Sequence, residues 1–394
     1  MSTDESQVRA AVAAVTDPEL RRPLGELGMV GGVRVKRKRV TVDLALPVGH
    51  YPQVDELTAR IRLAAGVLPG VDEVAVEQTV MGEEDRARLR LLLRGEPVDG
   101  EASGAGEGHG HDHAGHDHRA PLGHEEGRPN RFMLPRSKTR VIGVASGKGG
   151  VGKSSVTVNL AVALARMGYD VGILDADVYG FSVPKMLGVT EEPLIIGDLV
   201  VPATANGVRC LSMGFFVPDD TPVIWRGPML HKALEQFLVD AYWGEPDFLV
   251  VDMPPGTGDV TLSLGQYLTK TEIFVVTTPQ PAAQRVAQRS AYAARKLKLS
   301  VRGVIENMSW FTGDDEVRYE LFGSGGGKEL ATELGVPLLA QVPLVPAVRE
   351  GGDVGIPVVV ADPDGEAAAA FAALASTIAE MGPTRVYRKE LTVR

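Results

Sequence analysis

The chain has 394 residues, 44% of them hydrophobic, and a formal net charge of −10. This length predicts two or three domains, and the negative charge, without a long basic run, argues against nucleic acid as the main partner. The apolar stretches are too short to cross a bilayer and Met1–Ser6 lacks the basic start of a signal peptide, so we expect a cytoplasmic protein without a membrane partner. The single cysteine, Cys210, excludes an intramolecular disulfide and a multi-cysteine metal site within one chain.

Residues 1–91 are predicted to form a small α+β domain. Their apolar residues recur first at helical spacing and then in alternation, which predicts a helix, a two-stranded hairpin, a second helix and a third strand. The segments that carry this pattern are Val8 to Val15, Val33 to Leu46, Val54 to Leu68, and Val74 to Val80.

Three short segments of this domain, Asp17–Leu20, Leu27–Val30 and Pro69–Val71, resemble the MIP18-like domain, which is associated with iron–sulfur assembly. That family commonly carries Gly-Cys-Pro after the second strand. Here the corresponding segment, Gly49–Pro52, has no thiol. His50 is either a substitute ligand or an ordinary solvated loop residue.

Residues 92–135 are predicted to be a flexible linker, because large apolar residues are almost absent from them. Six of the eight histidines of the chain lie in this segment. Imidazoles and carboxylates at such close spacing can wrap a Zn²⁺, Ni²⁺ or Co²⁺ ion, whereas a soluble spacer with incidental histidines has the same composition. The candidate ligands for a transition metal are His109, His111, His113, His116 and His118.

Residues 136–382 are predicted to form an α/β domain, a P-loop NTPase with a doubly wound, mainly parallel sheet, because apolar strands alternate with helical segments. A basic tail, residues 383–394, follows and lacks the helical amphipathic pattern of a membrane anchor. After the first strand, the expected strands are Val171–Leu174, Phe248–Val251, Ile273–Thr277, Val301–Ile305, Leu338–Val342 and Pro357–Val360.

The first strand of this domain leads into a segment that fits the phosphate-loop pattern G-x-x-x-x-G-K-[ST] at Gly147–Ser154. Its glycines let the backbone turn N–H groups inward at a helix N-terminus, which suits a triphosphate. A glycine-rich turn that binds nothing is the alternative, but the predicted helix Ser155–Met167 supplies the context that the pattern requires. The predicted nucleotide-binding residues of the loop are Gly147, Lys148, Gly149, Gly150, Val151, Gly152, Lys153, Ser154 and Ser155.

Lys148 narrows the class of nucleotide-binding protein. Taken alone, it could be a solvated loop lysine. However, Gly-Lys-Gly-Gly-Val-Gly-Lys-Ser resembles the deviant Walker A box of the MinD/ParA/Mrp ATPases, whose extra lysine reaches the phosphates across a dimer interface. The resemblance implies a homodimer with ATP between its subunits. Lys153 and the partner subunit's Lys148 would then neutralise the charge that develops on the transferred phosphoryl group.

Aspartates follow two of the predicted strands, Asp175 and Asp177 after one and Asp252 after another. The carboxyl ends of parallel strands meet at one edge of the sheet, so we expect these carboxylates to converge on the phosphate loop. Simple helix caps are the alternative. In a Mg²⁺-dependent ATPase, Ser154 would bind the metal and Asp252 would hold it through water. Asp177 would orient the attacking water, with Asp175 near the metal.

A set of motifs along residues 140–380 resembles the Mrp/ApbC family of iron–sulfur carrier ATPases. They follow the family order and extend the likeness to most of the domain. The resemblance implies that Asn307 recognises the adenine base. The motifs are Gly147–Ser155, Asp175–Gly180, Asp252–Asp259, Thr278–Gln280, Glu306–Ser309 and Phe322–Gly327.

The chain departs from this family after the Asn-Met-Ser motif. Family members that bridge a cluster carry Cys-Pro-x-Cys there, and two cysteines from each subunit hold one [4Fe–4S] cluster. Residues Trp310–Tyr319 contain no cysteine, so an iron–sulfur cluster bound by the family route is in question. Cys210 lies in an apolar, strand-like segment and is expected to be a buried packing residue.

Three functions fit these observations. The resemblance favours an ATP-hydrolysing dimeric carrier that assembles iron–sulfur clusters or transfers them to apoproteins. An ATP-dependent chaperone for nickel, zinc or cobalt would instead use the histidine-rich linker. A nucleotide-switched dimer that positions a protein partner is the third. We adopt the first as the working prediction.

Overall fold

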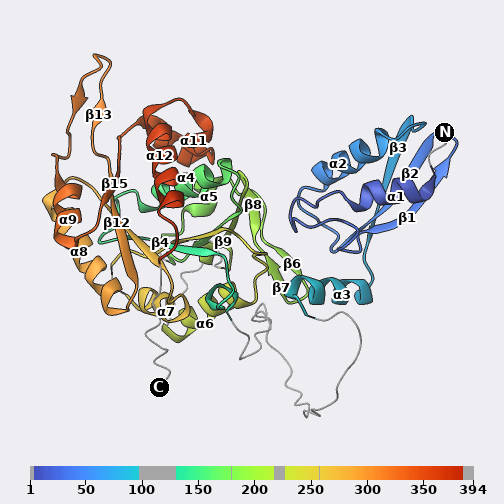
Figure 1. The fold of residues 1–394 in the computed structure, drawn as a ribbon, viewed down its shortest axis with the longest axis horizontal. Coiled ribbons are helices and arrows are strands. Elements are labelled where there is room, and N and C mark those ends of the chain that lie inside the picture. Colours follow the sequence, from blue (N-terminus) through green and yellow to red (C-terminus); the bar gives the residue numbers. More distant parts are fainter. Residues whose placement is uncertain (1–3, 97–129, 179, 217–226, 257, 385–394) are drawn as a thin grey trace, which may run out of the picture. The chain divides into compact units, whose positions relative to one another are not determined.

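The computed structural model describes residues 4–96, 130–178, 180–216, 227–256 and 258–384. The histidine-rich tract and almost all of the predicted tail lie outside the described residues. The chain divides into two compact units (Figure 1). The first comprises residues 1–126, 194–201 and 240–244, and the second comprises the remaining segments. The domain boundaries drawn from the sequence remain a prediction.

The N-terminal unit contains the helices and strands predicted for it. β1 pairs with β2 in an antiparallel hairpin that turns at residues 37–38, and β3 adds to β2 in parallel. Asp4 and Gln7 close a capping box at the start of the first helix. A further helix follows β3 and was not predicted; it extends beyond residue 91. The elements are α1 (Glu5–Ala13), β1 (Val30–Lys36), β2 (Arg39–Leu46), α2 (Val54–Gly66), β3 (Glu73–Val80) and α3 (Glu83–Arg94).

Two later segments, residues 194–201 and 240–244, complete the core of this unit, although both lie within the range predicted for the P-loop domain. A short hairpin, β6 (Leu194–Ile196) and β7 (Leu199–Val201), lies beside α3 (Figure 1). Tyr242 adds a second contact, because its hydroxyl donates to the carbonyl oxygen of Leu20 at 3.1 Å. The side chains that join the same buried apolar cluster are Leu194, Ile196, Leu199, Val201 and Tyr242.

Polar contacts fix the turn of this hairpin. The Arg94 guanidinium donates to Asp198 at 2.6 Å, and Arg90 lies 3.8 Å from the same carboxylate. Gly197, with a φ of +68°, stands directly before Asp198, and a Cβ atom there would collide with Arg90. Helix α3 and the hairpin therefore hold each other in place.

The second unit is built on one large sheet. Within the described residues, eight strands lie in the order β15-β12-β11-β4-β10-β5-β9-β8, and all neighbours are parallel except β8 and β9. This is the doubly wound, mainly parallel α/β sheet that the sequence predicted. The strands are β4 (Arg140–Ser146), β5 (Val171–Asp175), β8 (Ala203–Ala205), β9 (Val208–Ser212), β10 (Phe248–Asp252), β11 (Glu272–Thr277), β12 (Ser300–Asn307) and β15 (Leu338–Val342).

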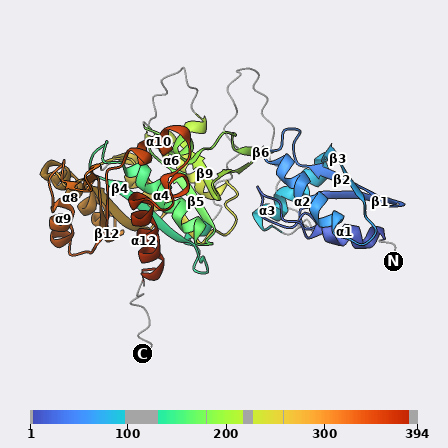
Figure 2. The ribbon, with the colours of Figure 1, turned by 90° about the horizontal axis from the view of Figure 1, so that it is seen from above.

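Helices cover both faces of this sheet. α4 and α12 lie side by side on one face, while α8 and α9 pack together on the other (Figures 1 and 2). The helices of this unit are α4 (Lys153–Arg166), α5 (Val183–Leu187), α6 (Gly227–Val239), α7 (Asp259–Tyr267), α8 (Pro281–Lys296), α9 (Gly326–Leu334), α10 (Pro346–Val354), α11 (Val358–Ala361) and α12 (Glu366–Glu380).

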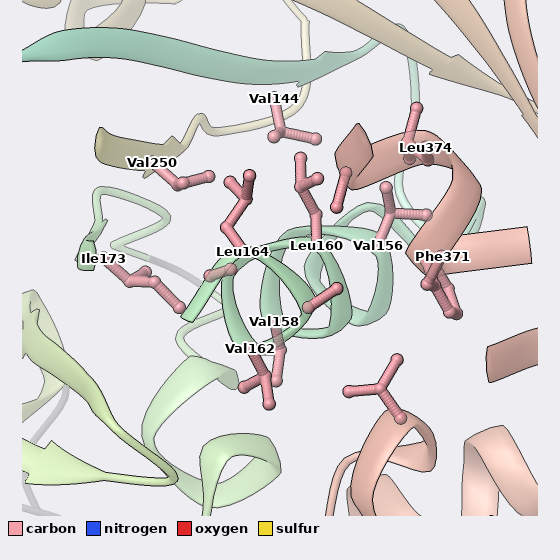
Figure 3. Close-up of a cluster of buried hydrophobic side chains, with 14 of the residues drawn as sticks. Val144, Val156, Val158, Leu160, Val162, Leu164, Ile173, Val250, Phe371 and Leu374 are labelled. Atoms are coloured by element: carbon pink, nitrogen blue, oxygen red, sulfur yellow. The ribbon is translucent and has the colours of Figure 1, made fainter. Parts of the chain in front are cut away.

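Helix α4 is buried almost all round, which explains its weakly amphipathic sequence. Figure 3 shows Leu160 and Leu164 pointing toward Val144 and Val250 of the sheet, while Phe371 of α12 closes the side of the cluster. Burial of these side chains stabilises the unit by roughly 25 cal/mol per Å² of apolar area removed from water. They also fix the start of α4, where the glycine-rich loop ends.

The strand expected at residues 357–360 is wrong. This segment forms α11, in which the N–H groups of Val360 and Ala361 both donate to the carbonyl oxygen of Pro357. Val358 and Val359 are both buried in the cluster that contains α4 and α12. A run of four apolar residues carries no usable period, so burial against helices, rather than sheet pairing, decided its conformation.

Two further features bear on function. None of the helices in the described part of the chain has the length and apolar character needed to span a bilayer. Residues 310–319 form a small hairpin of β13 (Phe311–Thr312) and β14 (Arg318–Tyr319), with the Arg318 guanidinium 4.2 Å from the ring centre of Trp310. This hairpin occupies the segment where the resembling family carries its two cysteines.

Candidate nucleotide site

The glycine-rich segment forms a tight loop between β4 and α4, at the carboxyl edge of the sheet. Gly150 and Gly152 have φ values of +80° and +77°, which only glycine adopts without strain. A Cβ atom on Gly152 would collide with the amide of Asn307, and one on Gly147 would collide with the backbone of α8. The loop therefore needs glycine for close packing as well as for its turn.

A pocket of about 400 Å³ opens over this loop. Residues from the loop, from the start of α4 and from the segment after β5 line it. Lys148, Lys153 and Asp177 are the charged groups among them, so the pocket presents two ammonium groups and one carboxylate. Its lining is Ser146, Lys148, Gly149, Gly150, Gly152, Lys153, Ser154, Ser155, Asp177, Gly180, Ser182, Met186 and Pro255.

A buried polar cluster lies at the base of the pocket. The ammonium group of Lys153 lies 2.5 Å from Asp252 Oδ2, and the Ser154 hydroxyl donates to the same oxygen at 2.6 Å. Asp177 Oδ2 lies 3.7 Å from the Lys153 ammonium. Asp252 is fully buried, so its charge depends on these partners. The structure thus brings together four of the residues predicted from the sequence.

Asp175 lies one strand away, behind the pocket rather than in its lining. It is fully buried and is in register with Asp252 on the neighbouring strand. Burial and the charge of Asp252 raise the pKa of Asp175 to about 7. Its Oδ1 accepts from the backbone N–H of Asp177 at 3.2 Å, and its Oδ2 accepts from the Ser212 hydroxyl at 3.0 Å. Asp175 therefore supports the loop that carries Asp177.

Asn307 closes β12 beside the loop. Its side-chain amide donates to the carbonyl oxygen of Val151 at 2.9 Å, and both residues are buried. The preceding residue, Glu306, is also buried and accepts from the N–H of Gly327 in the first turn of α9. Asn307 is thus placed against the backbone of the phosphate loop. Contact with a base is a separate expectation.

Two polar residues of the site were missed in the sequence. Thr157 donates to Asp252 Oδ1 at 2.6 Å, and Ser212 bonds to Asp175 as described above. Both carry a detectable signal: Thr157 lies four residues after Lys153 on a predicted helix, and Ser212 ends a short apolar run, as Asp175 does. Neither belongs to the phosphate-loop pattern, so the pattern alone could not select them.

The other candidate ligands do not gather into a metal site. Cys210 is completely buried in β9, as predicted, and burial raises the pKa of its thiol well above the usual range. His50 lies exposed in a turn. Over the ranges that the structure describes, no group of three His, Cys, Asp or Glu side chains could hold a metal ion. The tract from His109 to His118 falls outside those ranges.

A glycine-rich loop between a strand and a helix, with a lysine and a serine at the helix start and an aspartate at the end of the adjacent strand, defines a P-loop nucleotide-binding protein. The family model described as NUBPL iron-transfer P-loop NTPase matches residues 137–379, and one described as iron-sulfur cluster assembly protein matches residues 5–77. The chain belongs to this family of iron-transfer P-loop NTPases, which confirms the resemblance predicted from its sequence.

Individual relatives are similar to this chain over nearly its whole length. The chain is 43% identical over 364 residues to the iron-sulfur cluster carrier protein of Mycobacterium tuberculosis strain H37Rv, covering 91% of this chain and 88% of that one. It is 38% identical to the carrier protein of Synechocystis, covering 94% and 96%. A solved nucleotide-binding protein of Archaeoglobus fulgidus, in complex with ADP, shares 32% identity and a TM-score of 0.51 over 58% of this chain and 90% of that protein.

Proposed function

We propose that this chain is a Mg²⁺-dependent ATPase that carries iron–sulfur clusters to apoproteins. The observation that carries the proposal is the buried group of Lys153, Ser154 and Asp252 at the base of the phosphate-loop pocket, with Asp177 at its edge. The choice of an iron–sulfur cluster as cargo rests on relatives that are named iron-sulfur cluster carrier proteins and are similar over nine tenths of the chain. No membrane or nucleic-acid partner enters the proposal, and we place the protein in the cytoplasm.

The donor set suits a magnesium ion. A hydroxyl and carboxylates are the hard oxygen ligands that Mg²⁺ prefers, and Ser154 and Asp252 would hold it directly and through water. When bound, the ion neutralises phosphate charge during phosphoryl transfer. Lys153 places a further positive charge against the phosphates. Asp177 orients the attacking water, and Asp175 fixes the backbone of Asp177 through the hydrogen bond described above.

Two residues are assigned by the family pattern. Lys148 lines the pocket of its own chain, and in a homodimer the partner subunit's Lys148 would complete the charge around the phosphates. A dimer would therefore be needed for full turnover. Asn307, held against Val151 at the far side of the loop, would contact the adenine base.

In this proposal the cluster is cargo rather than a resident cofactor. Cys210 is unsuited to binding it, because a thiolate ligand must be accessible and this thiol is buried with a raised pKa. The cluster would therefore be held without the Cys-Pro-x-Cys pair that other members of the family carry. Ligands from apoprotein clients or small thiols would complete its coordination.

One observation favours a second candidate function. The only cysteine of the chain is buried, whereas six histidines are concentrated in residues 92–135. Imidazole ligands suit Zn²⁺, Ni²⁺ and Co²⁺ better than an iron–sulfur cluster. An ATP-dependent chaperone for one of these ions would use His109, His111, His113, His116 and His118.

The ATPase part is tested by steady-state hydrolysis with the purified full-length protein. Lys153→Ala and Asp177→Ala should lower kcat by at least about 100-fold, because each removes a group that acts on the transferred phosphoryl or on the water. Lys148→Ala should lose only the part of the rate that rises with protein concentration. Lys296→Ala, at the exposed end of α8, is the matched control. Near-normal hydrolysis by the Lys153 or Asp177 variant would refute the assignment.

The cargo is tested by anaerobic reconstitution with iron and sulfide, followed by iron, sulfide and zinc analysis and transfer to an apo-ferredoxin. ATP-dependent transfer by wild type, lost in the Lys153→Ala variant, supports the carrier. A protein that hydrolyses ATP, takes up no iron and sulfide and retains Zn²⁺ or Ni²⁺ supports the second candidate. Replacing the five tract histidines by asparagine should then release the metal.

A further inference from the structure

The two oxygens of the Asp252 carboxylate have different partners. Oδ2 contacts two residues of the pocket lining, Lys153 at 2.5 Å and Ser154 at 2.6 Å. Oδ1 accepts from the hydroxyl of Thr157, a residue outside that lining, at 2.6 Å. Asp252 and Thr157 are both fully buried, so the contact between Oδ1 and the Thr157 hydroxyl is closed to water.

Thr157 occupies this place because of helix geometry. It lies four residues after Lys153 on α4, and residues at that spacing share one face of a helix. The same face meets the end of β10, where Asp252 stands. The packing of α4 against β10 therefore brings Thr157 to Asp252, and the phosphate loop makes no contribution to this contact.

The hydroxyl of Thr157 has two acceptors within reach. A threonine inside a helix commonly donates to the carbonyl four residues back, and Lys153 O lies 3.0 Å away. Asp252 Oδ1 is closer, at 2.6 Å, and a carboxylate oxygen is a stronger hydrogen-bond acceptor than a backbone carbonyl. The single hydroxyl proton is therefore directed at the carboxylate.

We propose that Thr157 is a positioning residue that orients Asp252 for Mg²⁺, an inference that rests on the proposed function. Lys153 and Ser154 are the groups that the nucleotide and the metal engage, so the contacts to Oδ2 change when the site fills. The contact to Oδ1 uses a side chain outside the pocket lining and needs no such change. Thr157 keeps Oδ2 aimed at Ser154 while the other partners exchange.

A purely structural role makes different demands on this residue. Packing requires only the shape of the side chain, which valine reproduces. Positioning requires the hydroxyl, which serine retains. The pair Thr157→Val and Thr157→Ser therefore separates the two roles. Thr271→Val is the matched control, because Thr271 is also buried, its hydroxyl has one hydrogen-bond acceptor, the carbonyl oxygen of Leu268, and it lies directly before β11 and outside the pocket lining.

The experiment measures ADP affinity of the full-length protein by calorimetry, once in EDTA and once across a Mg²⁺ titration. Thr157→Val should bind ADP with normal affinity in EDTA. It should need about tenfold more Mg²⁺ than wild type for half of the maximal rise in ADP affinity, because removing a partner that orients a metal ligand typically weakens metal binding by that much. Thr157→Ser and Thr271→Val should match wild type.

Two outcomes would overturn the inference. One is an unchanged Mg²⁺ requirement in Thr157→Val, and the other is an equal defect in Thr157→Ser, which would assign the effect to the methyl group. Because the readout is binding, a wild-type protein that couples ADP to Mg²⁺ but hydrolyses no ATP would refute the proposed ATPase and leave this inference standing.

Discussion

The phosphate-loop site and the core of the N-terminal unit are assembled in opposite ways. Every charged residue of the site lies in the loop, ends a strand of one sheet or, like Asp177, follows such a strand by two residues, so local rules place it. The N-terminal core instead takes Leu199 and Tyr242 from segments more than a hundred residues beyond α3. The residues of the nucleotide site therefore obey a positional rule that can be followed in the sequence, whereas those of the N-terminal core do not.

The largest expected effect tests whether the hairpin belongs to the N-terminal core. Leu199→Ala leaves a cavity at a buried position and should cost about 2–5 kcal/mol of stability. The loss should appear as faster hydrogen exchange in β2, more than 150 residues away in sequence, with ADP affinity unchanged. Leu160→Ala, at a fully buried position on α4, is the matched control and should leave β2 exchange unaltered. Equal β2 protection in wild type and Leu199→Ala would contradict the shared core.

A second prediction concerns the other region and follows from the raised pKa of Asp175, about 7. The native state binds a proton that the unfolded state releases near pH 4, so this group lowers stability as pH rises from about 4 to 7. Asp175→Asn removes that dependence. Asparagine keeps both hydrogen bonds, because its oxygen accepts from Asp177 and its amide donates to Ser212.

The measurement for Asp175 is chemical unfolding in EDTA at a series of pH values. The free energy of unfolding of the variant, relative to that of wild type, should rise steadily between pH 4 and pH 7. Above that range the difference should be constant. Asp247→Asn, an exposed aspartate, serves as the control. A difference that stays constant across the series would show that the pKa of Asp175 is not raised in the folded protein.

The smallest expected effect is at the turn of the hairpin. Burial alone would raise the pKa of Asp198, but the hydrogen bond and charge of Arg94 lower it below its usual range. The ion pair therefore adds stability above about pH 4 that is lost as pH falls through the lowered pKa. The Asp198 side chain is 41% exposed, so Asp198→Asn should cost at most about 1 kcal/mol at pH 7. A cost above that, measured by urea unfolding, would mean that the turn is fixed mainly by this pair.

The elements that could be predicted from the sequence are those in which one pattern extends over many consecutive residues. The strand–loop–helix run around Lys153 and the buried strands that end at Asp175 and Asp252 were predicted almost to the residue. Sequence reasoning failed at Pro357, where four apolar residues carried no period. It also missed Thr157, because a hydroxyl on a predicted helix gains its role only through a strand almost a hundred residues later.

The hairpin and Tyr242 could not have been placed from sequence, for a physical reason. Leu194, Ile196 and Leu199 read as an ordinary short apolar run, and such a run fits any core. Which core it joins depends on the tertiary arrangement alone. No local propensity distinguishes a strand that extends the large sheet from one that leaves it.

The contact between Leu20 and Tyr242 spans 222 residues, and this has a consequence for biosynthesis. At roughly 5–20 residues per second, a ribosome needs on the order of 10–40 s to make the intervening chain. During that interval the nascent N-terminal unit lacks the hairpin and Tyr242, and the apolar side chains that these will cover stay open to other chains. Protection by a ribosome-associated chaperone would be needed most while residues 97–242 are being translated.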